Sequence, residues 1–381
     1  MSKIFNIKDL QSMKRFYELQ RERSDSFSGV SKDVIEIISK IKDKGDDALI
    51  EYTNRFDQNN LILQDLRVDN SIIRNSIKNI SEDLLEALLF SYERIHDYHK
   101  ELKPSDKSYV DKIKTKIDLK WSPIDSVGIY VPGGKAIYPS SVLMNVIPAI
   151  VAGVKRIVMV TPSINGALNE SILAAADICK VDEIYRIGGA QAIAALAYGT
   201  SLIKKVDMIV GPGNSYVAAA KKHVFGDVGI DMVAGPSEVV VVADADIDPD
   251  WVIEDLFAQA EHDNNAQSIL ITRDIEFASI IERKINDRLS KMKELNTLKN
   301  SWERYGSIIL CDNIEEISNL INDIAPEHLQ LCISNANELL KSIKNAGAIF
   351  IGKYTPEAIG DYVAGSNHVL PTLQTAKFSS G

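Results

Sequence analysis

The apolar residues between positions 31 and 102 recur every three or four positions, the spacing that places them on one face of a helix. The first apolar stripe consists of Val34, Ile35, Ile37, Ile38 and Ile41. Ser31 is a suitable N-cap for this helix. Gly45 interrupts the stripe, Ala48–Phe56 resumes it, and a further helix is predicted over 81–102. Residues 1–30 are polar and predict an N-terminal arm, or a short helix followed by a linker.

From position 126 onward, short β-branched runs alternate with alanine-rich helical segments. Strands are predicted at Val127–Val131, Arg156–Thr161, Glu183–Ile187, Val206–Val210, Val239–Ala243, Ser268–Thr272, Ser307–Leu310, Leu329–Ile333 and Ala348–Ile351. Helices are predicted at Ser140–Gly153, Asn165–Cys179, Ala190–Gly199, Asn214–Phe225, Asp250–His262, Ile275–Leu295, Ile314–Ile324 and Ala336–Asn345. This alternation is typical of βαβ units, in which helices cover both faces of a parallel sheet.

The pattern therefore predicts an α/β protein with two doubly wound units that join near residue 236. We predict that 126–236 is one unit, inserted into the other. The other unit would consist of 237–381 together with the helical region 31–125, and residues 1–30 would stay outside both as the arm.

Composition and charge narrow the classes of function. The chain has 381 residues, 45% of them hydrophobic, and a net charge of −10, which argues against a nucleic-acid-binding surface. No apolar run approaches the roughly 20 residues that cross a bilayer, and the N-terminus lacks a secretory pattern. The cysteines, Cys179, Cys311 and Cys332, are widely spaced and suggest free thiols. We therefore expect a cytoplasmic protein that binds neither membranes nor nucleic acid.

Four glycine-containing turns follow or flank the strands of the middle unit. They are Tyr130-Val131-Pro132-Gly133-Gly134, Gly188-Gly189-Ala190-Gln191, Gly211-Pro212-Gly213-Asn214 and Gly235-Pro236-Ser237-Glu238. Each glycine could serve only to make a turn, but four polar turns at one sheet edge favour a binding cleft. None of them is GxGxxG, so the usual dinucleotide fingerprint and its acidic ribose partner are absent.

Two further stretches carry polar side chains that suit a reaction. Gln259 and His262 are expected on one face of a helix, and Asp361 could complete with them a ligand set for zinc or manganese. Glu327 and His328 are adjacent in a predicted loop, and such a pair suits acid–base roles. For each stretch the alternative is a structural one, a solvated helix face or a capping residue.

These motifs, in this order, resemble those of the histidinol dehydrogenase family. The resemblance is carried by Gly189-Ala190-Gln191-Ala192, Gly211-Pro212-Gly213-Asn214, Ala234-Gly235-Pro236-Ser237-Glu238, Gln259-Ala260-Glu261-His262, Pro326-Glu327-His328-Leu329 and Gly360-Asp361-Tyr362 with Asn367-His368-Val369-Leu370-Pro371. It covers about residue 30 to the end. It implies a zinc-dependent homodimer with two incomplete Rossmann-like domains, the inserted one binding NAD. The implied reaction is the oxidation of L-histidinol through L-histidinal to L-histidine with two NAD, the last steps of histidine biosynthesis.

The resemblance also implies roles for individual residues. By position, Gln259, His262 and Asp361 look like zinc ligands that also contact the substrate, together with Ser237 and His328. Tyr130, Gln191 and Asn214 resemble the residues that line the NAD site. Glu327 and His328 look like the acid–base pair.

One feature of the family is missing from these residues. The family's chain continues past a sequence like Ser379-Ser380-Gly381 into a helical tail, which carries a further zinc-ligand histidine and a substrate-binding glutamate. Two alternatives therefore stay open beside the active enzyme. One is a truncated form or non-catalytic homologue that binds ligand without turnover, and the other is a related dehydrogenase that acts on a different amino alcohol or a sulfonated alcohol.

Overall fold

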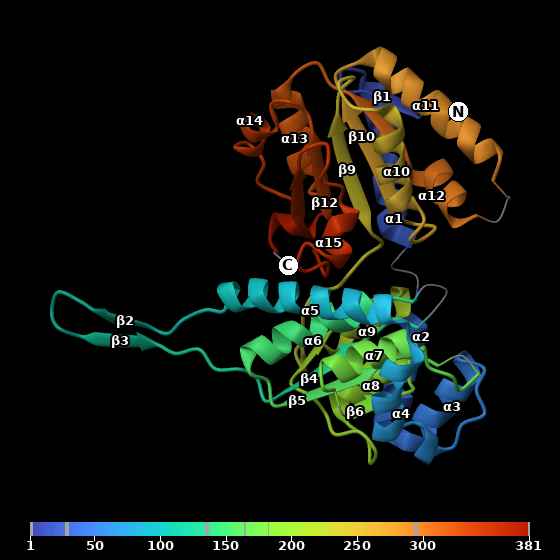
Figure 1. The fold of residues 1–381 in the computed structure, drawn as a ribbon, viewed down its shortest axis with the longest axis vertical. Coiled ribbons are helices and arrows are strands. Elements are labelled where there is room, and N and C mark those ends of the chain that lie inside the picture. Colours follow the sequence, from blue (N-terminus) through green and yellow to red (C-terminus); the bar gives the residue numbers. More distant parts are fainter. Residues whose placement is uncertain are drawn as a thin grey trace. The chain divides into compact units, whose positions relative to one another are not determined.

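A computed structural model describes residues 3–26, 30–133, 137–163, 165–181, 183–292 and 296–379. They fold into two compact units (Figure 1). The first unit comprises 1–29, 234–359 and 370–381, and the second comprises 30–233 and 360–369. Outside the described residues lie Met1, Ser2 and Phe27–Gly29 of the predicted arm, Gly134 of the first predicted turn, the last three residues of the predicted helix Ile275–Leu295, and the final Ser380-Gly381.

The first unit is built on a six-stranded parallel sheet. Its strand order is β1 (Ile4–Asn6), β11 (Ser307–Leu310), β10 (Gln267–Thr272), β9 (Glu238–Ala243), β12 (His328–Cys332) and β13 (Ala348–Ile351). Along β9, Val239 and Val241 enter one buried cluster while Val240 and Val242 enter another. Successive strand side chains point to opposite faces, so both faces of this sheet are buried under helices. Those helices are α1 (Leu10–Ser26), α10 (Pro249–Ala260), α11 (Ile275–Ser290), α12 (Thr297–Tyr305), α13 (Ile314–Ile324) and α14 (Ala336–Leu340).

The second unit contains a five-stranded parallel sheet. Its strand order is β6 (Glu183–Tyr185), β5 (Arg156–Val160), β4 (Ser126–Tyr130), β7 (Met208–Val210) and β8 (Gly229–Ile230). Its helices are α2 (Ser31–Lys44), α3 (Asp46–Phe56), α4 (Asn70–Ser76), α5 (Glu82–Leu102), α6 (Pro139–Ala152), α7 (Glu170–Ile178), α8 (Gly189–Tyr198) and α9 (Ser215–Val224). The short elements that remain are 3₁₀ turns at Leu63–Asp65, Ile77–Asn79 and Thr375–Lys377, and α15 (Ala358–Tyr362), which lies where the chain passes from the first unit to the second.

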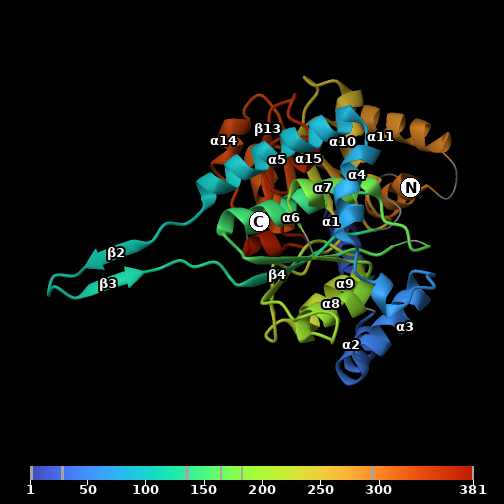
Figure 2. The same cartoon turned by 60° about the horizontal axis from the view of Figure 1, so that its bottom comes forward.

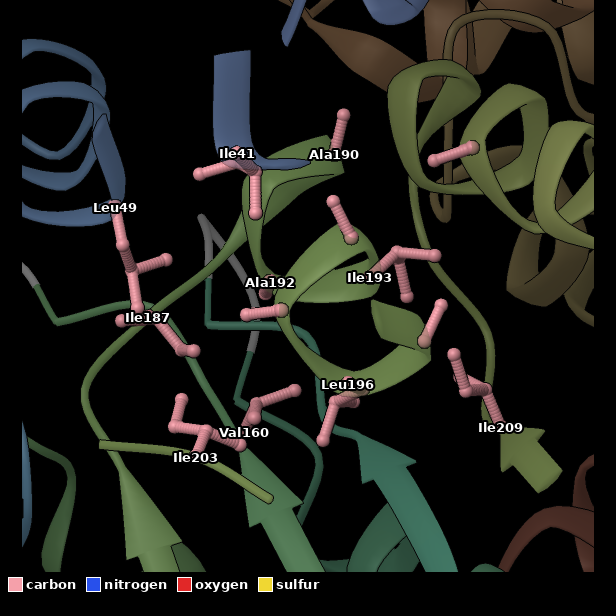
Figure 3. Close-up of a cluster of buried hydrophobic side chains, with 14 of the residues drawn as sticks. Ile41, Leu49, Val160, Ile187, Ala190, Ala192, Ile193, Leu196, Ile203 and Ile209 are labelled. Atoms are coloured by element: carbon pink, nitrogen blue, oxygen red, sulfur yellow. The ribbon is translucent and has the colours of Figure 1, made fainter. Parts of the chain in front are cut away.

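The α/β class and the two doubly wound parallel sheets are confirmed, and every predicted strand is present. The grouping of the segments differs from our prediction. The helices of 31–125 pack on the middle sheet, because the stripe of α2 and the apolar face of α3 share a buried cluster with α8. Figure 3 shows Ile41, Leu49, Ala192 and Ile193 in this cluster. Ser31 is the first residue of α2, whose N-cap is Val30.

The first residues of the chain are also part of the first unit rather than an arm. β1 pairs in parallel with β11, with Ile4 opposite Ile308, and Phe16 of α1 is fully buried. A three-residue strand gives no periodic signal, and its partner lies about 300 residues along the chain, so pattern alone could not find it.

A β-hairpin extends from the second unit between α5 and β4. Its strands, β2 (Lys107–Val110) and β3 (Lys116–Leu119), pair with each other alone, and all of their residues are exposed. Figures 1 and 2 both show it reaching away from the helices of its own unit. The exposed apolar side chains of this segment are Tyr109, Val110, Ile113, Ile117, Leu119 and Trp121. A two-stranded hairpin with so much exposed apolar surface is only marginally stable by itself.

The strand orders place a topological switch point in each sheet. In the second unit, the chain winds from β4 outward through β5 and β6, then returns to β7 on the other side of β4. In the first unit, β9 and β12 have the same relation. Ligands of such sheets usually bind at the carboxyl ends of the strands beside the switch point.

Three of the four predicted turns lie at that edge of the second unit, because they follow β4, β6 and β7. The fourth, Gly235–Glu238, does not. It leads into β9 and therefore lies at the amino end of a strand in the other sheet. Our prediction that all four turns share one sheet edge is wrong, because the middle sheet ends with β8, a strand of two residues that we did not predict.

All three cysteines are buried free thiols, as predicted. Burial raises the pKa of Cys179 and of Cys311 to about 12 and that of Cys332 to about 11. No helix among the described residues is both long enough and apolar enough to span a bilayer.

Candidate active site

The second unit contains a cavity of about 680 Å³. Its lining comes from the turns after β4, β5, β6 and β7 and from the helices α2 and α3. The lining residues are Asp33, Glu36, Ile37, Tyr52, Arg55, Phe56, Asp57, Tyr130, Gly133, Pro162, Gly189, Ala190, Gln191, Asn214 and Tyr216. Tyr130, Gln191 and Asn214, the three residues predicted to line a cofactor site, are therefore brought together in one cavity.

Tyr130 is the last residue of β4, and its side chain is buried. Its hydroxyl oxygen accepts a hydrogen bond from the backbone N–H of Gly189, 3.1 Å away, at the start of α8. Burial raises the pKa of Tyr130 to about 12, and the negative charge of Asp57 contributes to the shift. The phenol is therefore neutral at physiological pH and fixes the start of α8 at the wall of the cavity.

Gln191 is the lining residue whose side chain is best suited to a polar ligand. Its side chain is 1% exposed, and neither the amide oxygen nor the amide nitrogen has a hydrogen-bond partner. A buried amide without a partner costs about 1–3 kcal/mol, a cost that a polar ligand in the cavity would remove. A side chain at Gly189, where φ is +61°, would approach the Gln191 amide oxygen to 2.8 Å, so glycine is needed there.

Asn214 has a structural role as well as a place in the lining. It is the N-cap of α9, and its side-chain oxygen accepts hydrogen bonds from the N–H groups of Tyr216 and Val217. Its amide N–H₂ group remains as a donor toward a ligand. The turn before it is fixed by Lys221, whose buried ammonium donates to the Gly211 carbonyl oxygen.

The N-termini of α8 and α9 both contribute to the cavity lining. Helix N-termini present free N–H groups and a partial positive charge, so they bind phosphate and other anions. The cavity therefore suits a phosphate-containing ligand without the GxGxxG sequence.

The predicted acid–base pair lies in the first unit, at the amino end of β12. Glu327 and His328 are both buried, and the Glu327 carboxylate lies 3.8 Å from Nδ1 of His328. Glu327 Oε2 accepts a hydrogen bond of 2.9 Å from the backbone N–H of Glu238, the first residue of β9. Because β9 and β12 are neighbours, sheet pairing itself brings the two loops together.

The contacts of His328 determine which ring nitrogen carries the proton. Nδ1 lies 3.1 Å from the amide oxygen of Gln259 and 3.2 Å from the carbonyl oxygen of Glu238. Both partners are acceptors, so Nδ1 must donate. In the neutral ring the lone pair is then on Nε2, which is the arrangement that a general base needs.

An ion pair that we did not predict supports this site. Arg23 of α1 is 1% exposed and donates to the carboxylate of Glu238 at 2.6 Å and to the carbonyl oxygen of Pro236 at 2.5 Å. It therefore fixes the turn that carries Ser237 and the strand end that holds Glu327. A single arginine in a polar helix gives no sequence signal for such a role.

Gln259 and His262 are neighbours, but not on one helix face as we predicted. α10 ends at Ala260, and His262 lies in the following turn, where its N–H donates to the Gln259 carbonyl oxygen at 3.3 Å. The turn formers Asp263-Asn264-Asn265 prevent the helix from continuing. His262 is exposed, and the protein atoms around its imidazole lower its pKa from the usual value.

A further carboxylate near His328 is relevant to a metal. Glu357 is 2% exposed, and its carboxylate lies within 4.8 Å of an imidazole nitrogen of His328, which the sequence did not suggest. Its backbone N–H is held by Gln330, whose side chain donates in turn to Asp255. Asp361, the third predicted ligand, is on α15, and burial raises its pKa to about 6.

Comparisons with known proteins agree with the motifs. A profile of the family described as Histidinol dehydrogenase matches residues 19–381. The histidinol dehydrogenases of Rhizobium meliloti and Rhodospirillum rubrum are each 50% identical to the chain, over 96% of its length and over 84% and 85% of theirs. A crystal structure of histidinol dehydrogenase from Elizabethkingia anophelis superposes with a TM-score of 0.91 at 34% identity, covering 100% of this chain and 87% of that one.

Two doubly wound α/β units, with a cavity at the switch point of one, agree with the class that these relatives define, the NAD-dependent oxidoreductases. The comparisons define it further. The chain belongs to the histidinol dehydrogenase family.

Proposed function

We propose that this protein carries out the complete four-electron oxidation of L-histidinol, through L-histidinal, to L-histidine, in the final steps of histidine biosynthesis. In the first half, R–CH₂OH and NAD⁺ give R–CHO, NADH and a proton. In the second half, R–CHO, water and a second NAD⁺ give R–COO⁻, NADH and two protons. The observation that carries the proposal is the buried Glu327–His328 pair, whose hydrogen bonds leave Nε2 of His328 as the basic nitrogen.

In this proposal, His328 accepts the alcohol proton as hydride leaves the substrate carbon for NAD. The Glu327 carboxylate then takes a proton from the water that attacks the aldehyde. The hydrogen bond from the Glu238 N–H holds this carboxylate in place, and burial of the pair excludes bulk water. We place NAD in the cavity of the second unit, with Tyr130, Gln191 and Asn214 as its contacts.

Zinc fits the proposed ligands, Gln259, His262 and Asp361. They offer an amide oxygen, an imidazole nitrogen and a carboxylate oxygen, which are donors that zinc accepts. The Gln259 oxygen has two lone pairs, so one remains beside the hydrogen bond from His328. When bound, zinc supplies a fixed positive charge that anchors the imidazole and amine of the substrate, while Ser237 and His328 contact the rest.

The test is NADH formation from L-histidinol by this chain, with zinc added and then with a chelator. We expect production of two NADH per L-histidinol, lost with the chelator and restored by zinc. His262→Ala should reduce bound zinc from about one to zero per chain, measured by metal analysis after dialysis. Unchanged zinc content would refute the ligand assignment, and binding of NADH and zinc without any turnover would favour a non-catalytic homologue.

We also propose that the protein is a homodimer, in agreement with the exposed apolar hairpin. A second copy of the chain would cover side chains such as Ile113, which is 84% exposed, and Ile117, which is 57% exposed. The buried free thiols support a reducing compartment, the cytoplasm.

Placing charges on the hairpin should therefore shift the protein from dimer to monomer. Ile113→Glu with Ile117→Glu would bury two carboxylates in an apolar interface, a cost of several kcal/mol. Sedimentation velocity measures the mass directly. The control is Lys112→Gln with Lys120→Gln, which changes exposed polar residues of the same segment and leaves its apolar side chains intact. If the variant with Ile113→Glu and Ile117→Glu keeps the mass of the wild-type dimer, the apolar face is excluded as the interface.

A further inference from the structure

One wall of the cavity in the second unit does not come from the βα turns that usually bind a dinucleotide. It comes from α2 and from the end of α3, which contribute Asp33, Glu36 and Asp57. Arg55 is the one cationic side chain among the lining residues that the structure describes. Lys40 forms an ion pair with Glu36 at 3.2 Å, so Glu36 is partly neutralised. Neither Asp33 nor Asp57 forms an ion pair among the residues that the structure describes.

Asp57 differs from the other two carboxylates because it is partly buried. It is the C-cap of α3, and its backbone N–H donates to the carbonyl oxygen of Thr53. One carboxylate oxygen, Oδ2, is buried and lacks a hydrogen-bond partner. Burial raises the pKa of Asp57 to about 6, so the carboxylate is charged at neutral pH and can only accept hydrogen bonds.

A second, independent observation shows that this cavity is built for a ligand. The Gln191 amide, 1% exposed, is also without a partner and also lines the cavity. The cavity offers groups of opposite charge to different parts of one ligand. The N-termini of α8 and α9 suit phosphate groups, while an ionised carboxylate suits hydroxyl donors.

Dinucleotides carry both kinds of group. In nucleotide-binding sheets with the usual fingerprint, an acidic residue after the second strand accepts from the ribose 2′-hydroxyl and excludes the 2′-phosphate of NADP. That residue is absent from its usual place in this sequence. A 2′-phosphate near Asp57 would bring its own negative charge to a partly buried carboxylate, and the repulsion would be strong where water is largely excluded.

We infer that Asp57, supplied by a helix outside the sheet, accepts the hydrogen bonds of a dinucleotide ribose and makes this cavity select NAD over NADP. The inference rests on the proposed placement of NAD in this cavity. Asp33 adds negative charge to the same wall, and Arg55, whose guanidinium lies 5.5 Å from the Phe56 ring centroid, is too exposed to offset Asp57.

The experiment titrates the full chain with NADH and, separately, with NADPH, and follows nucleotide fluorescence, so no turnover is needed. Asp57→Asn keeps the shape of the side chain and removes its charge, and Asp57→Ser provides a second variant with a smaller side chain. We expect Kd for NADH to rise about tenfold and the preference for NADH over NADPH to fall about 10- to 100-fold. Glu51→Gln is the matched control, because Glu51 is an exposed carboxylate on α3 outside the cavity lining and should change neither constant.

Gln191→Leu separates failure of this inference from failure of the cofactor assignment. If Gln191→Leu weakens NADH binding while both Asp57 variants keep the wild-type preference, the role of Asp57 is refuted and the cavity remains the cofactor site. If neither Gln191→Leu nor the Asp57 variants alter NADH binding, the placement of NAD in this cavity is refuted as well.

Discussion

Replacing Glu327 with glutamine should slow oxidation of L-histidinal by about 10²- to 10⁴-fold and oxidation of L-histidinol to the aldehyde by less than about tenfold. Glutamine cannot take a proton from the attacking water, but its side-chain oxygen can still accept the hydrogen bond from the Glu238 N–H. The site should therefore keep its shape and lose only the second chemical step. Stopped-flow measurement of NADH from each substrate separates the two halves.

The control for this prediction is Glu338→Gln, because Glu338 is an exposed residue of α14, in the same unit and with no role in the proposed chemistry. It should leave both rates at the wild-type value. If Glu327→Gln slows the two substrates equally, the division of roles between Glu327 and His328 is wrong, and the carboxylate would act in both steps or in neither.

Replacing Arg23 with methionine should lower the stability of the first unit by about 3–5 kcal/mol. The methionine fills much of the space of the arginine, but the Glu238 carboxylate would stay buried without its cation. Glu238 also gives Glu327 its hydrogen bond, so we expect activity to fall with stability. Urea unfolding of the variant, followed by fluorescence and by activity, measures both effects.

The double variant Arg23→Met with Glu238→Gln tests the cause. It removes both charges, so most of the lost stability should return if the unpaired carboxylate is responsible. A double variant as unstable as the single one would show instead that Arg23 stabilises the unit through its hydrogen bonds to Pro236 and Asn265.

The fold could be predicted where burial imposes a regular pattern. β9 and β10 are buried on both faces, so they appear as continuous runs of apolar and β-branched residues with clear ends. The pattern of apolar residues could not predict which helices belong to which unit. The stripe of α2 shows that the helix packs against something, but only three-dimensional contact shows that the partner is α8.

The candidate site was likewise predictable in part. Motifs identified Tyr130, Gln191 and Asn214, and the structure places all three in one cavity. Asp57 and Arg23 were missed because each acts from a helix remote in sequence from the motif that it supports. An aspartate or an arginine is not unusual at either position in the sequence. Only the burial of their charged groups in the structure identifies these two residues.

The position of the acid–base pair at the amino end of β12 has an electrostatic consequence. In a parallel sheet with covering helices, the C-termini of the helices lie at this end, and here α10 ends at Ala260 and α13 ends at Ile324, next to Gln259 and Glu327. Helix C-termini carry a partial negative charge, which favours cations such as an imidazolium, an amino group or a metal ion. The cavity of the second unit has the opposite polarity, because helix N-termini line it. Apart from β1, the two sheets have the same strand order, so the two proposed sites lie at opposite ends of equivalent strands. Helix N-termini favour an anionic ligand in the second unit, and helix C-termini favour a cationic one in the first.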